Sequence, residues 1–263
     1  MSRERPVALI TGASMGLGAE FARLLASEGH DLIVTARSVD RLAALKKEVE
    51  GLHGVAVHVL VHDLADPKAP VALYDDVQAA GLEVEVLVNN AGFGMYGYFY
   101  QSDLQTELDM IQVNITAVVH LTKLFVRDMV ARKRGRILNV ASTAAFQPGP
   151  LQPVYYASKA FVLSFTEAVA NELHGTGVTA TALCPGPTPT EFQKRANVGN
   201  VRGLRMMMRI NPDAVVRAGY EGMMKGKPVV VPGTLNNTVI FLLRLFPRRA
   251  VTAVVRRVQA QRD

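Results

Sequence analysis

The stretch that decides the fold is Val7-Ala8-Leu9-Ile10, followed at once by Thr11-Gly12-Ala13-Ser14-Met15-Gly16-Leu17-Gly18. The first four residues predict a short buried strand, and the glycines predict a turn into a helix. That helix runs to about Ser27, and Gly29 ends it. Phe21, Leu24 and Leu25 fall on its inner face. A strand, a tight turn and a helix in this order are the opening unit of an α/β domain.

The same alternation continues along the chain. Strands are predicted at residues 31–36, 55–61, 84–88, 136–141 and 178–183, and helical patterns at 38–49, 69–80 and 103–131. There is no repeat and no low-complexity linker. We therefore predict a single-domain α/β fold, a Rossmann-like doubly wound parallel sheet flanked by helices. The domain is expected to cover residues 1–233, with residues 234–263 as a helical extension.

Composition narrows the function classes. The 263 residues are 49% hydrophobic and 20% charged, typical of a soluble globular protein. The segment from Met1 to Pro6 is charged, and the apolar run after it is too short for a signal peptide. No uninterrupted apolar run reaches the ~18 residues of a membrane span. The single cysteine, Cys184, excludes an internal disulfide and fits the cytoplasm. The six histidines are scattered, which argues against a metal site. Much of the +6 charge lies in the last twenty residues without an aromatic-basic patch, so we expect no nucleic-acid partner.

The glycines at 12, 16 and 18 also carry a functional interpretation. Glycine there lets the backbone approach a pyrophosphate that is held at a helix N-terminus. The spacing is Gly-x-x-x-Gly-x-Gly, and a glycine-rich turn without a ligand is the competing interpretation. The position between the first strand and a helix favours a dinucleotide site.

The end of the second predicted strand indicates which dinucleotide binds. An NAD site usually carries an acid there for the ribose 2′-hydroxyl, whereas here Arg37 follows Ala36. A guanidinium suits a 2′-phosphate, and Ser14 can add a hydroxyl donor. The competing interpretation of Arg37 is a solvated residue at a helix start. We predict NADP(H), with NAD(H) the less favoured cofactor.

Polar residues follow the third and fourth strands. Asp63 and Asn90 stand at strand carboxyl ends, where ligands bind in this fold class. Capping a turn and bonding the sheet edge are their competing roles. We expect a mixture of both.

Tyr155 and Lys159 are the candidate catalytic pair. Four residues apart on a predicted helix, their side chains lie on one face. An ammonium beside a phenol favours the phenolate and is expected to lower the phenol pKa, which makes Tyr155 a candidate proton donor or acceptor. Tyr156 has no such partner, because Ala160 stands four residues after it.

Taken together, these motifs resemble the short-chain dehydrogenase/reductase family. The resemblance covers roughly residues 6 to 192, in the family's order and spacing. The matching segments are Thr11 to Gly18, Asn89-Asn90-Ala91-Gly92, Asn114, Ser142, Tyr155 to Lys159 and Pro185-Gly186.

The resemblance implies a role for each matching residue. Ser142 orients the substrate, and Asn114 holds a water that relays protons to Lys159. A mid-helix asparagine within an apolar pattern independently suggests a polar task. Pro185-Gly186 closes over the nicotinamide, and Thr188 and Thr190 contact its carboxamide, although Pro187-Thr188-Pro189 departs from the family's usual valine-centred sequence. The implied cofactor site comprises Gly12, Ser14, Gly16, Leu17, Gly18, Arg37, Asp63, Leu64, Asn90, Ala91, Gly92, Tyr155, Lys159, Pro185, Gly186, Thr188 and Thr190.

The implied reaction is reversible hydride transfer between NADP(H) and a carbonyl or alcohol. Ser142 and Tyr155 hold the carbonyl oxygen, and Tyr155 gives it a proton. Two alternatives are a non-catalytic dinucleotide-binding sensor on the same fold and NAD-linked oxidation of a hydroxy substrate. The candidate pocket residues suggest an apolar ketone, sterol or acyl substrate, with residues 192–208 as a lid. These pocket residues are Phe93, Met95, Tyr96, Tyr98, Phe146, Pro148, Leu151 and Gln152.

The C-terminal extension combines an apolar run, residues 239–246, with valines at helical spacing and several arginines. Such a basic amphipathic helix is typical of peripheral contact with an anionic membrane. The alternative is that the apolar run packs on the domain or on a partner subunit, with the arginines in water. Family members commonly oligomerise, so the resemblance also implies a homo-oligomer, a dimer or tetramer.

Overall fold

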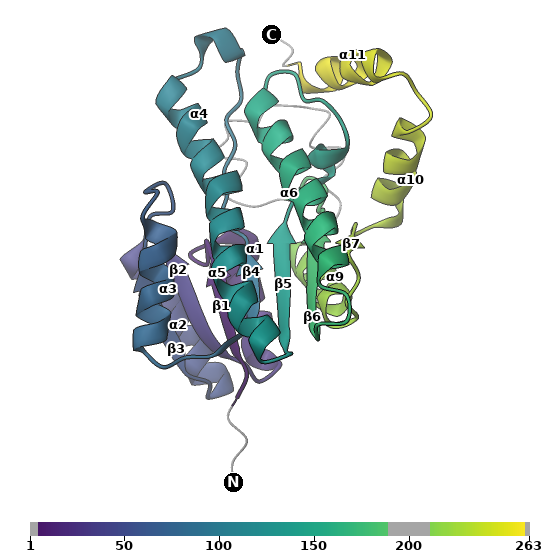
Figure 1. Ribbon diagram of the computed structural model, residues 1–263. Helices are drawn as coiled ribbons and strands as arrows, with labels where there is room; N and C mark the ends of the chain where they lie inside the picture. The colour runs from purple at the N-terminus through teal and green to yellow at the C-terminus, as the bar shows by residue number, and fades with distance from the viewer. Residues whose placement is uncertain (1–4, 189–210, 261–263) are drawn as a thin grey trace.

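The computed structural model describes residues 5–188 and 211–260, and its centre is one parallel sheet (Figure 1). The strand order is β3-β2-β1-β4-β5-β6-β7, so the order reverses beside β1. All carboxyl ends therefore meet at one edge, where ligands bind in open α/β sheets. The strands are β1 (Val7–Thr11), β2 (Asp31–Ala36), β3 (Val57–Val61), β4 (Val84–Asn89), β5 (Gly135–Val140), β6 (Val178–Leu183) and β7 (Val229–Val230).

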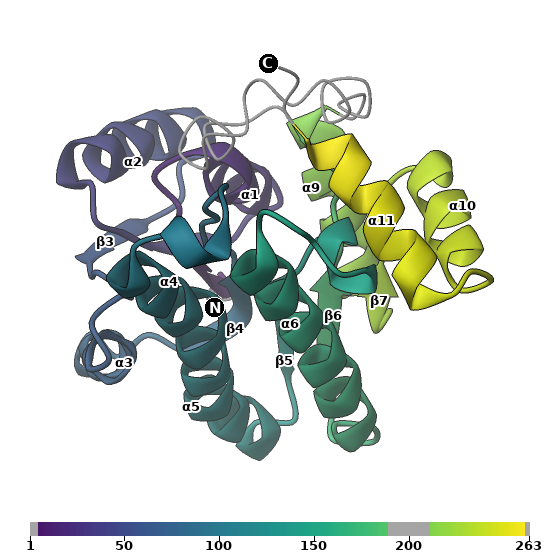
Figure 2. The same cartoon turned by 90° about the horizontal axis from the view of Figure 1, so that it is seen from above.

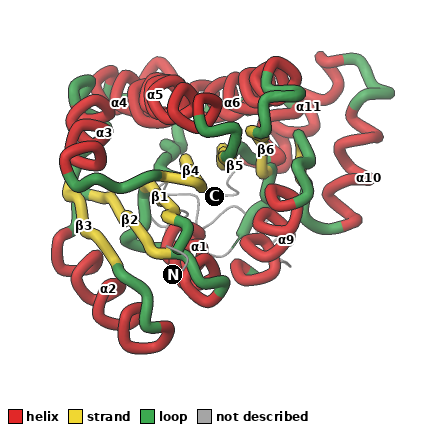
Figure 3. The backbone as a smooth tube through the Cα atoms, turned by 60° about the horizontal axis from the view of Figure 1, so that its bottom comes forward, coloured by secondary structure: helices red, strands yellow, loops and turns green. Residues whose placement is uncertain are grey.

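Helices cover both faces of the sheet (Figure 3). On one face lie α1 (Gly16–Ser27), α2 (Val39–His53) and α9 (Pro212–Met224), and their core includes Phe21 and Leu25. On the other face lie α3 (Ala69–Ala79), α5 (Ala117–Ala131) and α6 (Pro153–Glu172). The core of that face includes Leu73 and Phe125. Because both faces are covered, β1 is buried along its whole length. The predicted fold class is confirmed.

Most predicted boundaries agree with the structure to within two residues. Helix α9 lies where no element was predicted, and two other differences have local causes. Helix α2 continues four residues further, to His53, and ends where Gly54 adopts a left-handed conformation at φ 62°. Strand β7 was not predicted, because two residues carry no periodicity. It pairs in parallel with β6 at the sheet edge.

The long helical pattern at residues 103–131 is interrupted by one wider turn. Helix α4 (Leu104–Ile111) begins at Asp103, whose carboxylate accepts a hydrogen bond from the Thr106 backbone at 2.8 Å. A π-helical turn, η2 (Gln112–Thr116), then leads directly into α5. Such turns often occur at functional sites, and this one contains Asn114.

Two helices form the C-terminal extension, α10 (Thr234–Leu243) and α11 (Arg248–Gln259). Seen from above, α11 crosses the carboxyl edge of the sheet near the start of α6 (Figure 2). Val251 and Val255 of α11 are buried against Ala144 and Tyr156. No helix within residues 5–188 and 211–260 is long and apolar enough to cross a membrane.

Candidate active site

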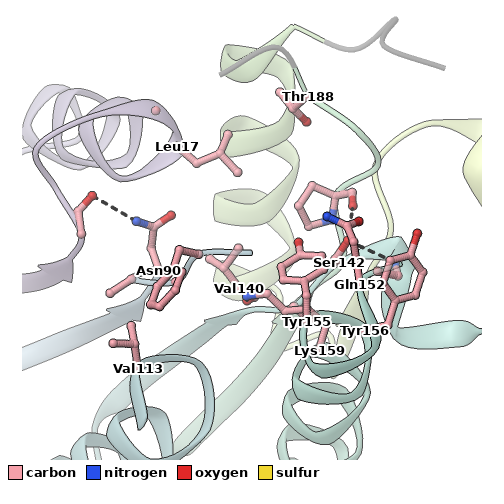
Figure 4. Close-up of a pocket in the computed structure, with 18 of the residues that line it drawn as sticks. Leu17, Asn90, Val113, Val140, Ser142, Gln152, Tyr155, Tyr156, Lys159 and Thr188 are labelled. Carbon is pink, nitrogen blue, oxygen red and sulfur yellow. Dashed lines mark hydrogen bonds between the residues drawn. The ribbon is translucent and has the colours of Figure 1, made fainter. Parts of the chain in front are cut away.

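A cavity of about 490 Å³ opens at the carboxyl edge of the sheet. One part is lined by the glycine turn, including Gly12 and Leu17, and by the ends of β2 and β3. The other part is lined by Tyr155, by Gln152 and by the inner faces of α10 and α11. Figure 4 shows Tyr155, Lys159 and Ser142 side by side, across the cavity from Leu17 and Asn90. The topology therefore brings together side chains from both ends of the sequence.

Ser142 and Tyr155 form a hydrogen-bonded pair. Ser142 lies just after β5 and caps the N-terminus of the short helix η3 (Thr143–Phe146), and its hydroxyl accepts from the Ala144 backbone at 3.1 Å. The same hydroxyl lies 3.4 Å from the carbonyl oxygen of Pro185 and also bonds the Tyr155 phenol. This serine is thus fixed in place and directed at the phenolic oxygen.

The pKa of Tyr155 departs from the sequence-based expectation. Burial raises the pKa of the phenol well above its usual range, and the hydrogen bond between Tyr155 and Ser142 opposes that rise only in part. The ammonium of Lys159 lies 5.9 Å from the centre of the Tyr155 ring, so the two side chains do meet. It is not among the groups that lower the pKa of Tyr155. The expected lowering by Lys159 was wrong for this state of the site, because desolvation dominates.

Lys159 is buried, and the same desolvation acts on it in the opposite direction. Burial lowers the pKa of Lys159 to about 8. Its ammonium donates to the carbonyl oxygen of Val140 at 2.8 Å, which ties α6 to the end of β5. Two charged or ionisable groups with poor hydration at a cavity wall are typical of a catalytic site.

Asn114 is 1% exposed, and neighbouring groups hydrogen-bond both the nitrogen and the oxygen of its side-chain amide. Its amide nitrogen donates to the carbonyl oxygen of Phe93 at 2.9 Å and to the hydroxyl of Ser158 at 3.0 Å. Its oxygen accepts from the Phe93 backbone at 3.1 Å. A Cβ atom built on Gly92 would lie 3.0 Å from that oxygen and 3.4 Å from the Lys159 nitrogen. Asn114 therefore reaches the surroundings of Lys159, and the π-helical turn η2 aims it there.

The glycine turn is packed too tightly for other residues. Gly12 has φ +66°, and a Cβ on Gly18 would lie 2.3 Å from the carbonyl oxygen of Gly12. The side chain of Asn90 donates to the carbonyl oxygens of Thr11 at 2.8 Å and Gly12 at 3.3 Å. Asn90 thus shapes the turn and also lines the cavity. Gly18 does not line the cavity; it lets the backbone fold back on itself.

Arg37 and Asp63 meet at the mouth of the cavity. The guanidinium lies 3.6 Å from the carboxylate, and the side chains are 65% and 48% exposed. Both residues line the cavity, as do Ser14 and Leu64. The guanidinium of Arg41 donates a hydrogen bond to the sulfur of Met15 at 3.7 Å. Arg41 itself does not line the cavity, but Met15 does, so a second cation lies close to the glycine turn.

The segment after β6 completes the cofactor side. Pro185, Gly186 and Thr188 line the cavity, and the Thr188 hydroxyl donates to the carbonyl oxygen of Gly186 at 2.9 Å. A Cβ on Gly186 would lie 2.7 Å from the side-chain amide of Asn236 on α10, so a larger residue there would displace that side chain. The predicted residue Thr190 and the predicted lid, residues 192–208, lie outside the described residues.

The predicted substrate pocket was correct only in part. Phe93 and Gln152 line the main cavity, whereas Phe146 and Pro148 line a smaller one of about 220 Å³ beside it. Met95, Tyr96, Tyr98 and Leu151 line neither cavity. The apolar wall that the sequence did not predict comes from the C-terminal helices: Val239, Leu243, Val251, Val254, Val255 and Val258.

Helix α11 is fastened over the site by polar contacts. Gln259 is buried, its amide nitrogen donates to the Tyr156 hydroxyl, and its backbone carbonyl accepts from Tyr96. The guanidinium of Arg256 donates to the Tyr98 hydroxyl at 3.1 Å. Tyr96 and Tyr98 thus hold the wall in place rather than forming it. Within the described residues, no cluster of side chains is suited to hold a metal ion.

Comparison with known proteins gives consistent matches. The model of the short chain dehydrogenase family matches residues 6–200. The chain is 42% identical over 195 residues to a Streptomyces violaceoruber protein provisionally named ketoacyl reductase 1 of the granaticin polyketide synthase, covering 73% of this chain and 71% of that one. It is 34% identical over 195 residues to 17-beta-hydroxysteroid dehydrogenase type 3 of Mus musculus, covering 72% and 62%.

Two solved structures share the fold over nearly the whole chain. One is a short-chain dehydrogenase from Sphingobium yanoikuyae in complex with NADPH, with TM-score 0.81, 30% identity and coverage of 92% and 97%. The other is a short chain dehydrogenase/reductase from Burkholderia phymatum in complex with NAD, with TM-score 0.82, 25% identity and coverage of 92% and 94%. On the family model, the relatives and the fold, this chain belongs to the short-chain dehydrogenase/reductase family of oxidoreductases.

Proposed function

We propose that the protein is an NADP(H)-dependent reductase of bulky, largely apolar ketones, including sterol and acyl types. The observation that carries the proposal is the hydrogen-bonded pair Ser142–Tyr155 in the cavity that both the glycine turn and the apolar residues of α10 and α11 line. A cavity of about 490 Å³ is within the usual size range of small-molecule sites. The named activities of the ketoacyl reductase and hydroxysteroid dehydrogenase relatives support an apolar ketone as substrate.

The residues present fit a nicotinamide dinucleotide. Gly12 and Gly16 present backbone and no side chain to the cavity before α1 and at its start, where a pyrophosphate is favourably held, and Gly18 lets the turn fold tightly behind them. Leu64, Ala91 and Gly92 line the cleft further along, and Pro185, Gly186 and Thr188 line its far side. When bound, the nicotinamide supplies or accepts the hydride.

The remaining chemistry belongs to the side chains. Ser142 and Tyr155 donate to the carbonyl oxygen of the substrate and stabilise the negative charge that develops there. Tyr155 then gives its proton, and burial makes this phenol hold the proton until the alkoxide forms. Lys159, cationic below about pH 8, favours the resulting phenolate, and Asn114 holds the water through which the proton is replaced.

We assign NADP(H) rather than NAD(H) on the end of β2. Ala36 leaves no acid for a ribose 2′-hydroxyl, and Arg37 supplies a guanidinium at the cavity mouth. Asp63 already holds that guanidinium at 3.6 Å, in an exposed and therefore weak ion pair that a phosphate can replace.

The test is a panel of ketones of graded size with purified protein, following NADPH oxidation. Turnover of bulky apolar ketones, absent in Tyr155→Phe, is the expected result. A protein that binds NADPH but reduces none of them would instead be the alternative, a dinucleotide-binding sensor. The complete set Asn114, Ser142, Tyr155 and Lys159 argues against that alternative, since a sensor has no need of it.

We also propose that the protein is a cytoplasmic homo-oligomer, a dimer or tetramer. Helix α4 exposes three large apolar side chains, Leu104, Leu108 and Ile111, which is an unfavourable surface for an isolated subunit. Mass measurement in solution, with Leu108→Gln as the disrupting variant, tests this assignment.

A further inference from the structure

The turn that joins α10 to α11 exposes large apolar side chains. In this segment, residues 241–249 (the tip), only Leu243 is partly covered. Phe241 is 62% exposed, Leu245 65% and Phe246 59%. Figure 1 shows the two helices at one corner of the molecule, with the turn between them directed away from the sheet. Contiguous exposed apolar side chains of this size mark an interaction surface.

The same segment is strongly cationic. Arg244, Arg248 and Arg249 belong to the tip, and all three are exposed. No aspartate or glutamate occurs between Glu221 and Asp263. None of the ion pairs formed by the described residues involves these three arginines. Their charges are therefore free to meet an anionic surface.

The arrangement of apolar and basic groups identifies the partner. The cavity of about 220 Å³ beside the tip is lined by Arg244 and Arg248 together with apolar residues such as Phe246 and Val251. An apolar surface next to guanidinium groups complements an acyl chain that carries an anionic headgroup. A second copy of this chain offers no acidic counterpart at the same tip, so a symmetric pairing of two tips would bring like charges together.

We propose that the tip docks the protein on an anionic lipid surface. The sequence predicts such contact through the apolar face of the basic helix, but Val251 and Val255 of α11 are buried against the domain. The inserting groups are instead Phe241, Leu245 and Phe246, with the arginines at headgroup level. The inner faces of α10 and α11 wall the main cavity, so docking places that wall beside the phase in which an apolar ketone dissolves. This last consequence rests on the proposed function; the docking itself does not.

The experiment is co-sedimentation of the full chain with vesicles of phosphatidylcholine, with and without phosphatidylglycerol. We expect binding to the anionic vesicles that weakens with salt, because the attraction is screened. Neutralising all three tip arginines to glutamine should lower the partition coefficient by about 100-fold, at about fivefold for each charge. The matched control neutralises three exposed cations elsewhere, Lys47, Lys123 and Arg127, for the same change in net charge.

The apolar contribution is tested separately with Phe241→Ser combined with Phe246→Ser. Both side chains are exposed, so the variant should keep its thermal unfolding midpoint and lose vesicle binding. Size-exclusion chromatography is run on the same samples. Docking is refuted if the full chain ignores anionic vesicles at low salt, or if the control triple variant loses binding as much as the tip variant. It is also refuted if the two serines dissociate an oligomer and leave vesicle binding intact.

Discussion

Replacing Arg37 with glutamine isolates the charge that we assign to the 2′-phosphate of NADP(H). The guanidinium is 65% exposed and lies 3.6 Å from Asp63, so its ion pair contributes only about 0–1 kcal/mol to folding and its loss should be tolerated. A guanidinium hydrogen-bonded to a phosphate contributes about 1.5–3 kcal/mol. The dissociation constant of NADPH should therefore rise about 10- to 100-fold. That of NADH should stay nearly unchanged, because NADH has no phosphate there.

The assay is titration of each variant with NADPH and with NADH, and the quantity compared is the ratio of the two dissociation constants. Two controls separate the possible contacts. Asp63→Asn removes the competing carboxylate and should tighten NADPH binding, and Arg41→Gln removes the other cation near the glycine turn. An unchanged ratio in Arg37→Gln would refute the assignment. If Arg41→Gln alone changed the ratio, the phosphate contact would belong to α2.

Three further outcomes follow from the contacts at the site. Tyr155→Phe should lower turnover by about 10²–10⁴-fold with NADPH affinity retained, while Tyr156→Phe, which only loses its bond to Gln259, should be mild. In the wild type, kcat/KM for reduction should fall as the pH rises above about 8, because Lys159 loses its charge there. The variant Lys159→Arg stays cationic and should not show that fall. Asn114→Ala leaves the Phe93 backbone unpaired and should lower the free energy of unfolding in urea by about 1–3 kcal/mol as well as the rate; unchanged stability would contradict these hydrogen bonds.

The parts of the fold that sequence predicts are those that local physics dictates. The glycine turn could be predicted because its constraints act within a few residues. Gly12 adopts a positive φ, and a Cβ on Gly18 would have no room. Strand β2 was predicted with its full bounds because a parallel strand buried on both faces is a continuous apolar run. Which element an amphipathic helix packs against depends on contacts between residues far apart in the sequence, so local patterns do not predict it. The valines of α11 predicted an amphipathic helix, with membrane contact and packing on the domain or a partner both left open, and their spacing did not indicate that they line the cavity.

The difference between local and long-range effects also explains why the expected direction of the Tyr155 pKa shift was wrong. Helical spacing correctly predicted that Lys159 would lie beside the phenol, because a helix places residues four apart on one face. The direction of the pKa shift depends on how much water the surrounding elements exclude. Ser142, Pro185 and the C-terminal wall close around the phenol from positions far apart in the chain. Desolvation is therefore a property of the assembled fold, and it outweighs the nearby charge.

The residues that line the cavity come from two parts of the sequence, one proposed to carry the chemistry and the other proposed to select the substrate. The family model ends at residue 200, and every residue of the set Asn114, Ser142, Tyr155 and Lys159 lies before that point. The apolar wall from Val239 to Val258 lies wholly after it. The proposed chemistry therefore rests on residues inside the segment that the family model matches, whereas the proposed substrate site depends on this chain's own C-terminal helices. We accordingly expect exchange of α10 and α11 with those of a relative to change the preferred ketone and to leave the cofactor preference intact, because Arg37 and the glycine turn remain in place.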